Sequence, residues 1–335
     1  MRPIMAYWGG KIDSQTRKAD AMLRKSYMSA DQQIGLLTIR GMTFPSEKTA
    51  RAALDREGYY NIISGYKDPF VEADTQYDVF RAGTTFDHVY ELFLIDRDLR
   101  ALLFQATEQA EAFLRTTCIR CFSRAHPQEK NAYLELDHYA NPRDAHSLLG
   151  RFLSILRHNE PGIASTRDTQ PCISVPIQKY DGEVPLWNLA RALTLGQLTT
   201  FYRVLSVQQR SDIAQEMTRI AKSSASCELT PEQLDSLYHH ILTYRNLCAH
   251  HRRLYCAYPQ YAQISLFDMI QQLQLVIRKS DYLEFLMKVW TLLRRIYTKL
   301  PPDAAAYVLE ALGLGPDVKG GMTSYERWVD MARKA

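Results

Sequence analysis

Apolar residues recur every three or four positions along most of the chain, which is the spacing of an amphipathic helix. The longest such pattern covers residues 86–124, and Thr85 is expected to cap its first turn. Because this run is longer than a typical globular helix, we expect at most one break in it. Its stripe consists of Phe86, Val89, Phe93, Leu103, Thr107, Ala110, Leu114 and Cys118.

Shorter helical patterns occupy most of the remaining chain. Residues 29–57 predict two short helices that each begin after a serine, and Pro231 is expected in the first turn of another helix. Residues 159–184 are rich in Pro, Gly, Ser and Thr and predict a long loop. The other helical segments are 185–202 with a break at Gly196, 264–299 with two helices, and 300–335 with two short helices.

These patterns together predict an all-α protein. We find no internal repeat and no low-complexity tract. The expected parts are a basic, partly ordered segment at 1–28, an N-terminal helical subdomain at 29–80, a helical bundle at 81–299 and a C-terminal helical tail at 300–335.

Composition and charge constrain the function only loosely. The chain has 335 residues and a net charge of +4, which permits an anionic partner without requiring one. Its cations are 28 Arg and 13 Lys, and arginine suits bidentate contacts with phosphate. The first residues lack the apolar stretch of a signal peptide, and no window is apolar enough to span a membrane. With six scattered cysteines, the chain is expected to be cytoplasmic, with no membrane partner.

The segment YRNLCAHHRRLY at 244–255 concentrates cations and imidazoles at the end of a predicted helix. An arginine followed five to seven residues later by a histidine also occurs at Arg81, Arg120 and Arg151, so spacing alone carries little information. The adjacent Asn246 and the doubled histidine distinguish this copy. It is either a solvated helix end, where cations complement the dipole, or a site that binds phosphate.

This segment resembles the RNxxAHHxRLW signature of the Abi-like (abortive infection, AbiD/AbiF type) family. Residues 58–70, 80–116 and 185–202 also resemble blocks of that family in the same order, so the resemblance covers about residues 29–260. Tyr255 departs from it, since the family often has Trp there. The family is similar to HEPN proteins, helical bundles of which many are metal-independent RNases. The resemblance therefore implies a HEPN-like bundle and an endoribonuclease that needs no cofactor and no metal.

The resemblance implies Arg245, Asn246 and His250 as catalytic residues. RNA supplies the 2′-hydroxyl nucleophile, a histidine can exchange protons with the reacting oxygens, and Arg245 can donate two hydrogen bonds to the phosphate. The products would be a 2′,3′-cyclic phosphate and a 5′-hydroxyl. His251, Arg252 and Arg253 are expected to bind the RNA backbone or to be helix-end charges.

Helix geometry suggests that this motif is half of a site. Five residues correspond to about 500° of rotation, so Arg245 and His250 would lie about 140° apart on a regular helix. They converge only if the helix ends or distorts near Ala249, or if a second copy completes the site. One histidine cannot easily serve as both acid and base, so we expect a homodimer. Glu111 or Asp96, two charges on or beside the long stripe, could hold Arg245 by an ion pair.

Other candidate sites have simpler explanations. Cys118 and Cys121 with His126 could suggest zinc, but a lone pair of cysteines is far more often part of a core. His239 and His240 are expected to be structural or on the surface. The aromatic residues of 59–70, around a turn expected at Gly65 and Pro69, could stack on bases but more often pack together. These aromatic residues are Tyr59, Tyr60, Tyr66 and Phe70.

The sequence thus predicts a bacterial abortive-infection or toxin-like endoribonuclease, restrained by a structured noncoding RNA or by a protein antitoxin. One alternative is a non-catalytic RNA-binding protein that grips a small RNA through the same motif. A third is a helical scaffold that binds no RNA.

Overall fold

The computed structural model describes residues 27–73, 77–160, 169–221, 228–258, 260–314 and 318–334. Nearly all of the predicted segment 1–28 lies outside these ranges. Helices dominate the described residues, and only three isolated β-bridges occur among them, so the fold is all-α as predicted. None of the helices in the described ranges combines the length and apolarity needed to cross a bilayer.

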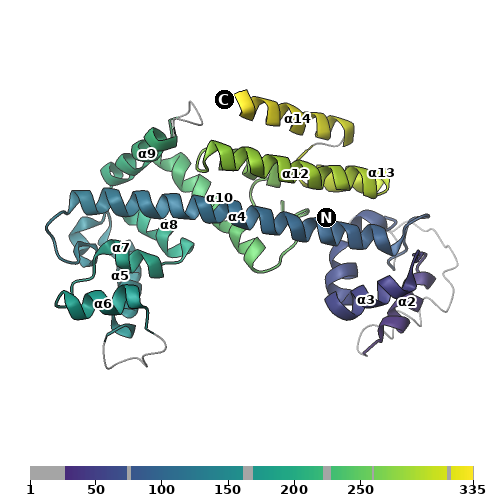
Figure 1. Cartoon of the computed structure of the whole chain (residues 1–335), viewed down its shortest axis with the longest axis horizontal. Coiled ribbons are helices and arrows are strands. Elements are labelled where there is room, and N and C mark those ends of the chain that lie inside the picture. Colours follow the sequence, from purple (N-terminus) through teal and green to yellow (C-terminus); the bar gives the residue numbers. More distant parts are fainter. Residues whose placement is uncertain are drawn as a thin grey trace, which may run out of the picture. The chain divides into compact units, whose positions relative to one another are not determined.

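The chain divides into two compact units, and Figure 1 labels their helices. Unit 1 comprises Met1–Asp98, Leu292–Glu310 and Gly315–Gly321. Unit 2 comprises Leu99–Thr291, Ala311–Leu314 and Met322–Ala335. The boundaries expected from the sequence at 80/81 and 299/300 stay a prediction.

Unit 1 begins with the two short helices that the sequence predicted. The Ser29 and Ser46 side chains accept backbone hydrogen bonds at their first turns, as expected for N-caps. The aromatic stretch that follows is helical rather than a turn at Gly65, because Gly65 itself lies in helical backbone. These elements are α2 (Ala30–Ile39), α3 (Glu47–Glu57), the π-helical turn η1 (Tyr60–Ser64) and the 3-10 turn η2 (Asp68–Phe70).

The long helix α4 (Phe86–Ala125) runs without the break that its length allowed. The Thr85 hydroxyl accepts the backbone N–H of His88 at 3.2 Å, as expected for a cap. All eight residues of the predicted apolar stripe are buried. Residues 86–98 of α4 belong to unit 1 and the remainder to unit 2.

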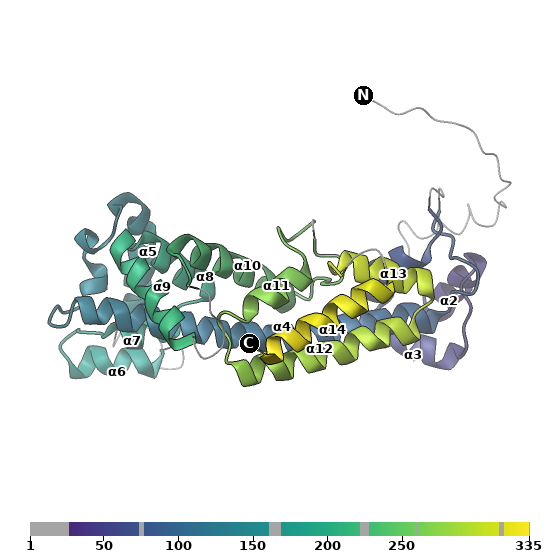
Figure 2. The same ribbon diagram turned by 90° about the horizontal axis from the view of Figure 1, so that it is seen from above.

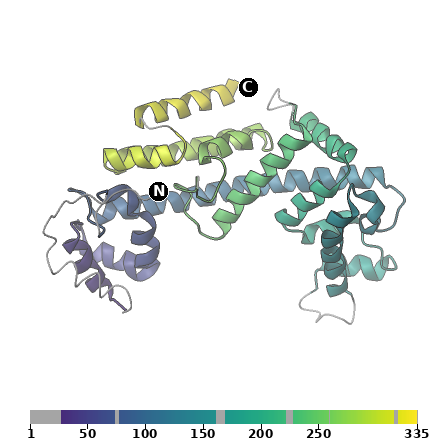
Figure 3. The same cartoon turned by 180° about the vertical axis from the view of Figure 1, so that it is seen from behind.

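Unit 2 contains most of the other helices. The helix α8 contacts both α5 and α10, and α9 contacts α10. Figures 2 and 3 show these helices from two further directions. The elements are η3 (Ala132–Leu134), η4 (Leu136–His138), α5 (Pro142–His158), α6 (Pro171–Lys179), α7 (Leu186–Leu189), η5 (Ala190–Ala192), α8 (Leu195–Val204), α9 (Val207–Ala221), α10 (Pro231–Ala249) and α11 (Leu266–Leu273).

Two expectations for this region were wrong. Residues 171–179 of the predicted loop form α6, which begins with Pro171 in its first turn, while 161–168 lie outside the described residues. The break in 185–202 falls before Thr194, not at Gly196. Thr194 forms a capping box with Gln197, so α8 starts at Leu195, one residue before Gly196.

The C-terminal region holds α12 (Lys279–Lys299), α13 (Pro302–Ala311) and α14 (Val318–Lys334). The two helices expected in 264–299 are confirmed as α11 and α12. In unit 2, α14 packs on α12, because the Tyr325 ring stacks on Trp290 at 5.8 Å and its hydroxyl donates to the Leu286 carbonyl. With 17 residues, α14 is longer than the short piece expected there.

Candidate functional site

The helix α10 carries Arg245 and Asn246 near its end. It begins at Pro231 as predicted, after a capping box formed by Thr230 and Gln233. One side of α10 is buried, including Leu234, Tyr238 and Ile241. These apolar positions recur at intervals of three and four, so they orient the helix in unit 2.

Three contacts join α10 and the turn after it to α4. The buried Tyr238 hydroxyl donates to the Ala110 carbonyl at 2.8 Å. The Arg245 guanidinium lies over the Phe104 ring, 6.0 Å from its centroid. After the helix ends, Arg100 donates to the Arg252 carbonyl at 3.4 Å. Along α10 toward Ala249, the contacted residues of α4 thus lie progressively closer to the N-terminal end of α4.

The helix ends at Ala249, and a tight turn follows. His250 is the C-cap, and its N–H donates to the Asn246 carbonyl at 3.0 Å. The N–H of His251 donates to Cys248, and that of Arg252 donates to Leu247, at 3.2 and 2.9 Å. This pair of bonds is a Schellman motif. On a regular helix Arg245 and His250 would point in different directions, so within one chain they could converge only if the helix ended or distorted near Ala249. The helix α10 does end at Ala249.

His251 occupies the left-handed position of that motif, with a φ of 54°. Glycine is the usual residue there, because a side chain with a Cβ is strained in this conformation. Leu247, Cys248, Leu254 and Tyr255 around the turn are buried. The turn is therefore held in place by packing, despite the strain at His251.

The polar residues of the motif lie on the accessible side of this turn. His250, His251 and Arg252 are exposed, while Arg245 and Asn246 are half-buried. Arg253 is also half-buried. The turn thus presents adjacent cationic and imidazole groups to solvent, where a phosphodiester could approach.

Arg245 is held by groups that leave its charge uncompensated. Its Nη1 donates to the Asn246 side-chain oxygen at 3.2 Å, and its guanidinium stacks on Phe104. No carboxylate within the described ranges forms an ion pair with Arg245. A cation–π contact positions a guanidinium without neutralising it. Arg245 can therefore accept an anion from outside.

The two expected supporting carboxylates have other contacts. Glu111 pairs with Arg115 four residues on, and Arg115 also donates to the carbonyls of Ala190 and Leu193. Asp96 is buried in unit 1 and accepts the Tyr66 hydroxyl at 2.7 Å. Since no carboxylate of the described ranges is ion-paired with Arg245, only a less direct supporting role of Glu111 or Asp96 stays a prediction.

The structure also shows where the cysteine, histidine and aromatic side chains lie for which the sequence suggested packing roles. Burial raises the pKa of the Cys118 thiol, which favours the protonated form and disfavours metal ligation. His240 is buried, with Nδ1 3.0 Å from the Gln272 side-chain oxygen, as expected for a structural residue. Tyr66 and Phe70 are also buried, so they cannot stack on bases, whereas Tyr60 is exposed.

A family model described as Abi-like protein matches residues 52–256, more than half of the chain and all of the motif. The resemblance expected from the sequence began earlier, at about residue 29. No curated protein and no solved structure matches the chain.

Replacing His251 by glycine tests the turn. Glycine adopts a positive φ without strain, so we expect His251→Gly to raise the free energy of unfolding by about 1 kcal/mol. His251→Val should lower it, since a β-branched residue is disfavoured there. Urea unfolding followed by circular dichroism measures both. A glycine variant less stable than the parent chain would mean that the turn has another conformation.

Proposed function

Because the chain belongs to the Abi-like protein family, we propose that it is a metal-independent endoribonuclease of the HEPN type, with Arg245, Asn246 and His250 as catalytic residues. Family membership supports a role in abortive infection. The observation that carries the nuclease proposal is the exposed turn after α10, with Arg245 stacked on Phe104 and not paired with a carboxylate within the described ranges. An arginine committed to structure would more often have its charge compensated.

The reaction uses the 2′-hydroxyl of the RNA. Its oxygen forms a bond to the adjacent phosphorus while the bond from phosphorus to the 5′-oxygen breaks. An imidazole accepts the 2′ proton, and a protonated imidazole supplies a proton to the leaving 5′-oxygen. The products are a 2′,3′-cyclic phosphate and a 5′-hydroxyl. His250 is the proposed imidazole, since it is exposed and sits at the C-cap of α10.

Arg245 and Asn246 are proposed to bind the attacked phosphate. The guanidinium can donate two parallel hydrogen bonds to non-bridging oxygens, which gain charge in the transition state. The Asn246 side-chain oxygen already accepts a hydrogen bond from Arg245, so its amide N–H groups remain to donate to a phosphate oxygen. His251, Arg252 and Arg253 would contact the neighbouring backbone.

Two copies of the motif are proposed to face each other in a homodimer. One copy then supplies the proton acceptor and the other the proton donor, which a single His250 cannot easily do in one step. Regulation is needed as well, because an unrestrained RNase harms its host. A structured noncoding RNA is the proposed restraining partner, and a protein antitoxin is the alternative.

The same exposed turn supports a second candidate, a non-catalytic RNA-binding protein. His251 and Arg252 are exposed and suit contacts with the RNA backbone without any chemistry. A protein of this kind would copurify with nucleic acid in a salt-sensitive way and would cut nothing.

Two substitutions in the motif distinguish these candidates. We expect Arg245→Ala and His250→Ala each to slow cleavage of single-stranded RNA by about 100-fold or more, and to abolish toxicity on expression. Arg151→Ala and His146→Ala are matched controls, because both residues are exposed on α5 and lie outside the motif. The measurement is the rate of cleavage of labelled RNA by purified protein.

The outcomes of this experiment are distinct. The RNA-binding candidate is supported if wild type binds RNA without cutting it and if the motif variants bind RNA more weakly. If wild type cuts RNA and both motif variants cut at the same rate, the assigned residues are wrong.

Native mass spectrometry tests the two-copy site. We expect the active protein to be a dimer whose dissociation on dilution reduces cleavage in parallel. A monomer that cuts RNA at full rate would exclude a site shared between two copies.

A further inference from the structure

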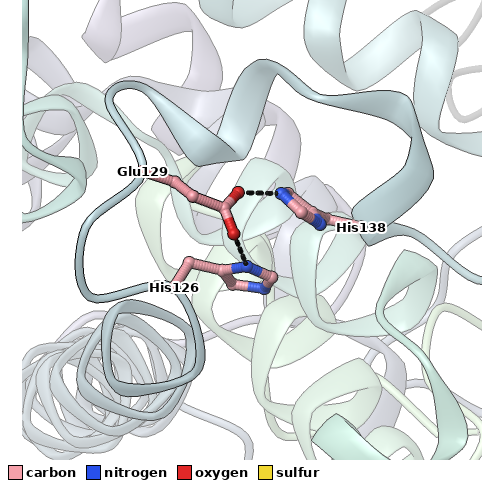
Figure 4. Close-up of side chains that lie close together, drawn as sticks. All are labelled: His126, Glu129 and His138. Atoms are coloured by element: carbon pink, nitrogen blue, oxygen red, sulfur yellow. Dashed lines mark hydrogen bonds and ion pairs between the residues drawn. The ribbon is translucent and has the colours of Figure 1, made fainter.

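Three potential metal ligands meet where α4 ends, and the proposed nuclease does not use them. His126 directly follows α4, Glu129 lies three residues on, and His138 is the last residue of η4. Figure 4 shows the Glu129 carboxylate between the two imidazoles. One carboxylate oxygen lies 3.4 Å from Nδ1 of His126, and the other lies 2.5 Å from Nε2 of His138. All three candidate ligand atoms lie within 4.8 Å of one another.

The two imidazoles are held by packing. Phe122, a buried residue of α4, has its ring centroid 4.6 Å from that of His126 and 6.3 Å from that of His138. The two imidazole centroids are 3.9 Å apart. Only 12% of the His126 side chain and 19% of the His138 side chain are exposed, against 49% for Glu129. Two ligands are thus positioned in advance, and the third can adjust.

We propose that His126, Glu129 and His138 bind a Zn²⁺ ion. Two imidazoles and a carboxylate are a donor set that Zn²⁺ accepts, with a water as the fourth ligand. Ligand atoms around a tetrahedral Zn²⁺ lie about 3.3 Å apart, given bonds of about 2.0–2.1 Å. The distance of 3.4 Å between Nδ1 of His126 and a carboxylate oxygen of Glu129 is close to this value. A movement of the exposed Glu129 side chain would lengthen its shorter contact with His138.

The charge of Glu129 also suits a cation. Its carboxylate lies within hydrogen-bond distance of both imidazoles, and an anionic ligand offsets part of the charge of a divalent ion. The bound ion would connect His126, at the end of α4, to His138, at the end of η4. This role is structural and does not depend on the proposed nuclease.

Gln209 of α9 gives the proposal a sharper test. Its side-chain oxygen accepts the Ser206 N–H at 3.3 Å, which directs its amide nitrogen toward Nε2 of His126 at 3.3 Å. Nε2 therefore accepts a hydrogen bond, and Nδ1 carries the proton that is donated to Glu129. Zn²⁺ can bind Nδ1 only if the proton moves from Nδ1 to Nε2. The new N–H at Nε2 would then face the N–H of the Gln209 amide, so Gln209 disfavours Zn²⁺ binding at Nδ1.

The first experiment titrates Zn²⁺ into metal-stripped full-length protein at pH 8 by calorimetry. We expect one ion per chain, a higher melting temperature with Zn²⁺, and the loss of both effects in Glu129→Gln and His138→Gln. These two substitutions keep the approximate size of each side chain, so they should preserve the fold. His146→Ala on α5 is the matched control, and His250→Ala tests whether the motif binds the ion instead. Both variants should bind Zn²⁺ as wild type does.

The second experiment uses Gln209→Glu. A carboxylate at this position can still cap α9 and can accept a hydrogen bond from the Nε2–H of Zn²⁺-bound His126, so Zn²⁺ affinity should rise about 10-fold. Co²⁺ in place of Zn²⁺ should give the visible absorption of a tetrahedral site. If wild type binds no Zn²⁺, or if binding survives in His138→Gln, the three residues are only a hydrogen-bonded cluster and the proposal is wrong. If Gln209→Glu does not strengthen binding, the assignment of Nδ1 as the His126 ligand is wrong.

Discussion

The packing of α10 on α4 determines where the motif lies in unit 2. The buried Tyr238 hydroxyl needs a partner and donates to the Ala110 carbonyl, which ties the rotation of α10 to one position on α4. Further along, Arg245 lies on Phe104 and the backbone after the helix reaches Arg100. A rotation of α10 by one residue, about 100°, would break all three contacts and expose the buried stripe. The position of Arg245 is therefore a consequence of core packing.

The distribution of counter-charges follows from the same arrangement. Arg115 on α4 is compensated by Glu111 and by two backbone carbonyls, so it fastens α4 to the segment before α8. Arg245 has an amide and an aromatic ring instead. Both arginines are partly sheltered from solvent, but only one has a carboxylate partner. This difference separates an arginine that stabilises the fold from one that is available for an anion.

The sequence predicted the helices well wherever one strong signal decided the outcome. The stripe of α4 is buried at every predicted position, and Ser29, Ser46 and Pro231 mark helix starts. The errors came from residues that act in two ways. Proline and serine in 171–179 indicated a loop, yet proline is tolerated in the first turn of a helix, as Pro171 is in α6. Gly196 indicated a break, but the cap at Thr194 set the start of α8.

The sites were only partly predictable for physical reasons. Helix periodicity could not show that His251 takes a left-handed conformation, because the Schellman position usually contains glycine. Along the sequence His126 stands near Cys118 and Cys121, whereas the fold brings it to Glu129 and His138. The spacing of His126 and Glu129 alone was a weak signal of a metal site. His138 is brought close to them by the 3-10 turns η3 and η4, the second of which it ends.

The chemical nature of the RNA ends distinguishes the proposed 2′-hydroxyl attack from other routes of RNA cleavage. Fragments released by the purified protein from a defined RNA can be analysed by mass spectrometry, with a second substrate that lacks the 2′-hydroxyl at the cut position. We expect 2′,3′-cyclic phosphate and 5′-hydroxyl ends, and no cut in the deoxy substrate. Fragments with 3′-hydroxyl and 5′-phosphate ends, or cleavage at the deoxy position, would contradict it.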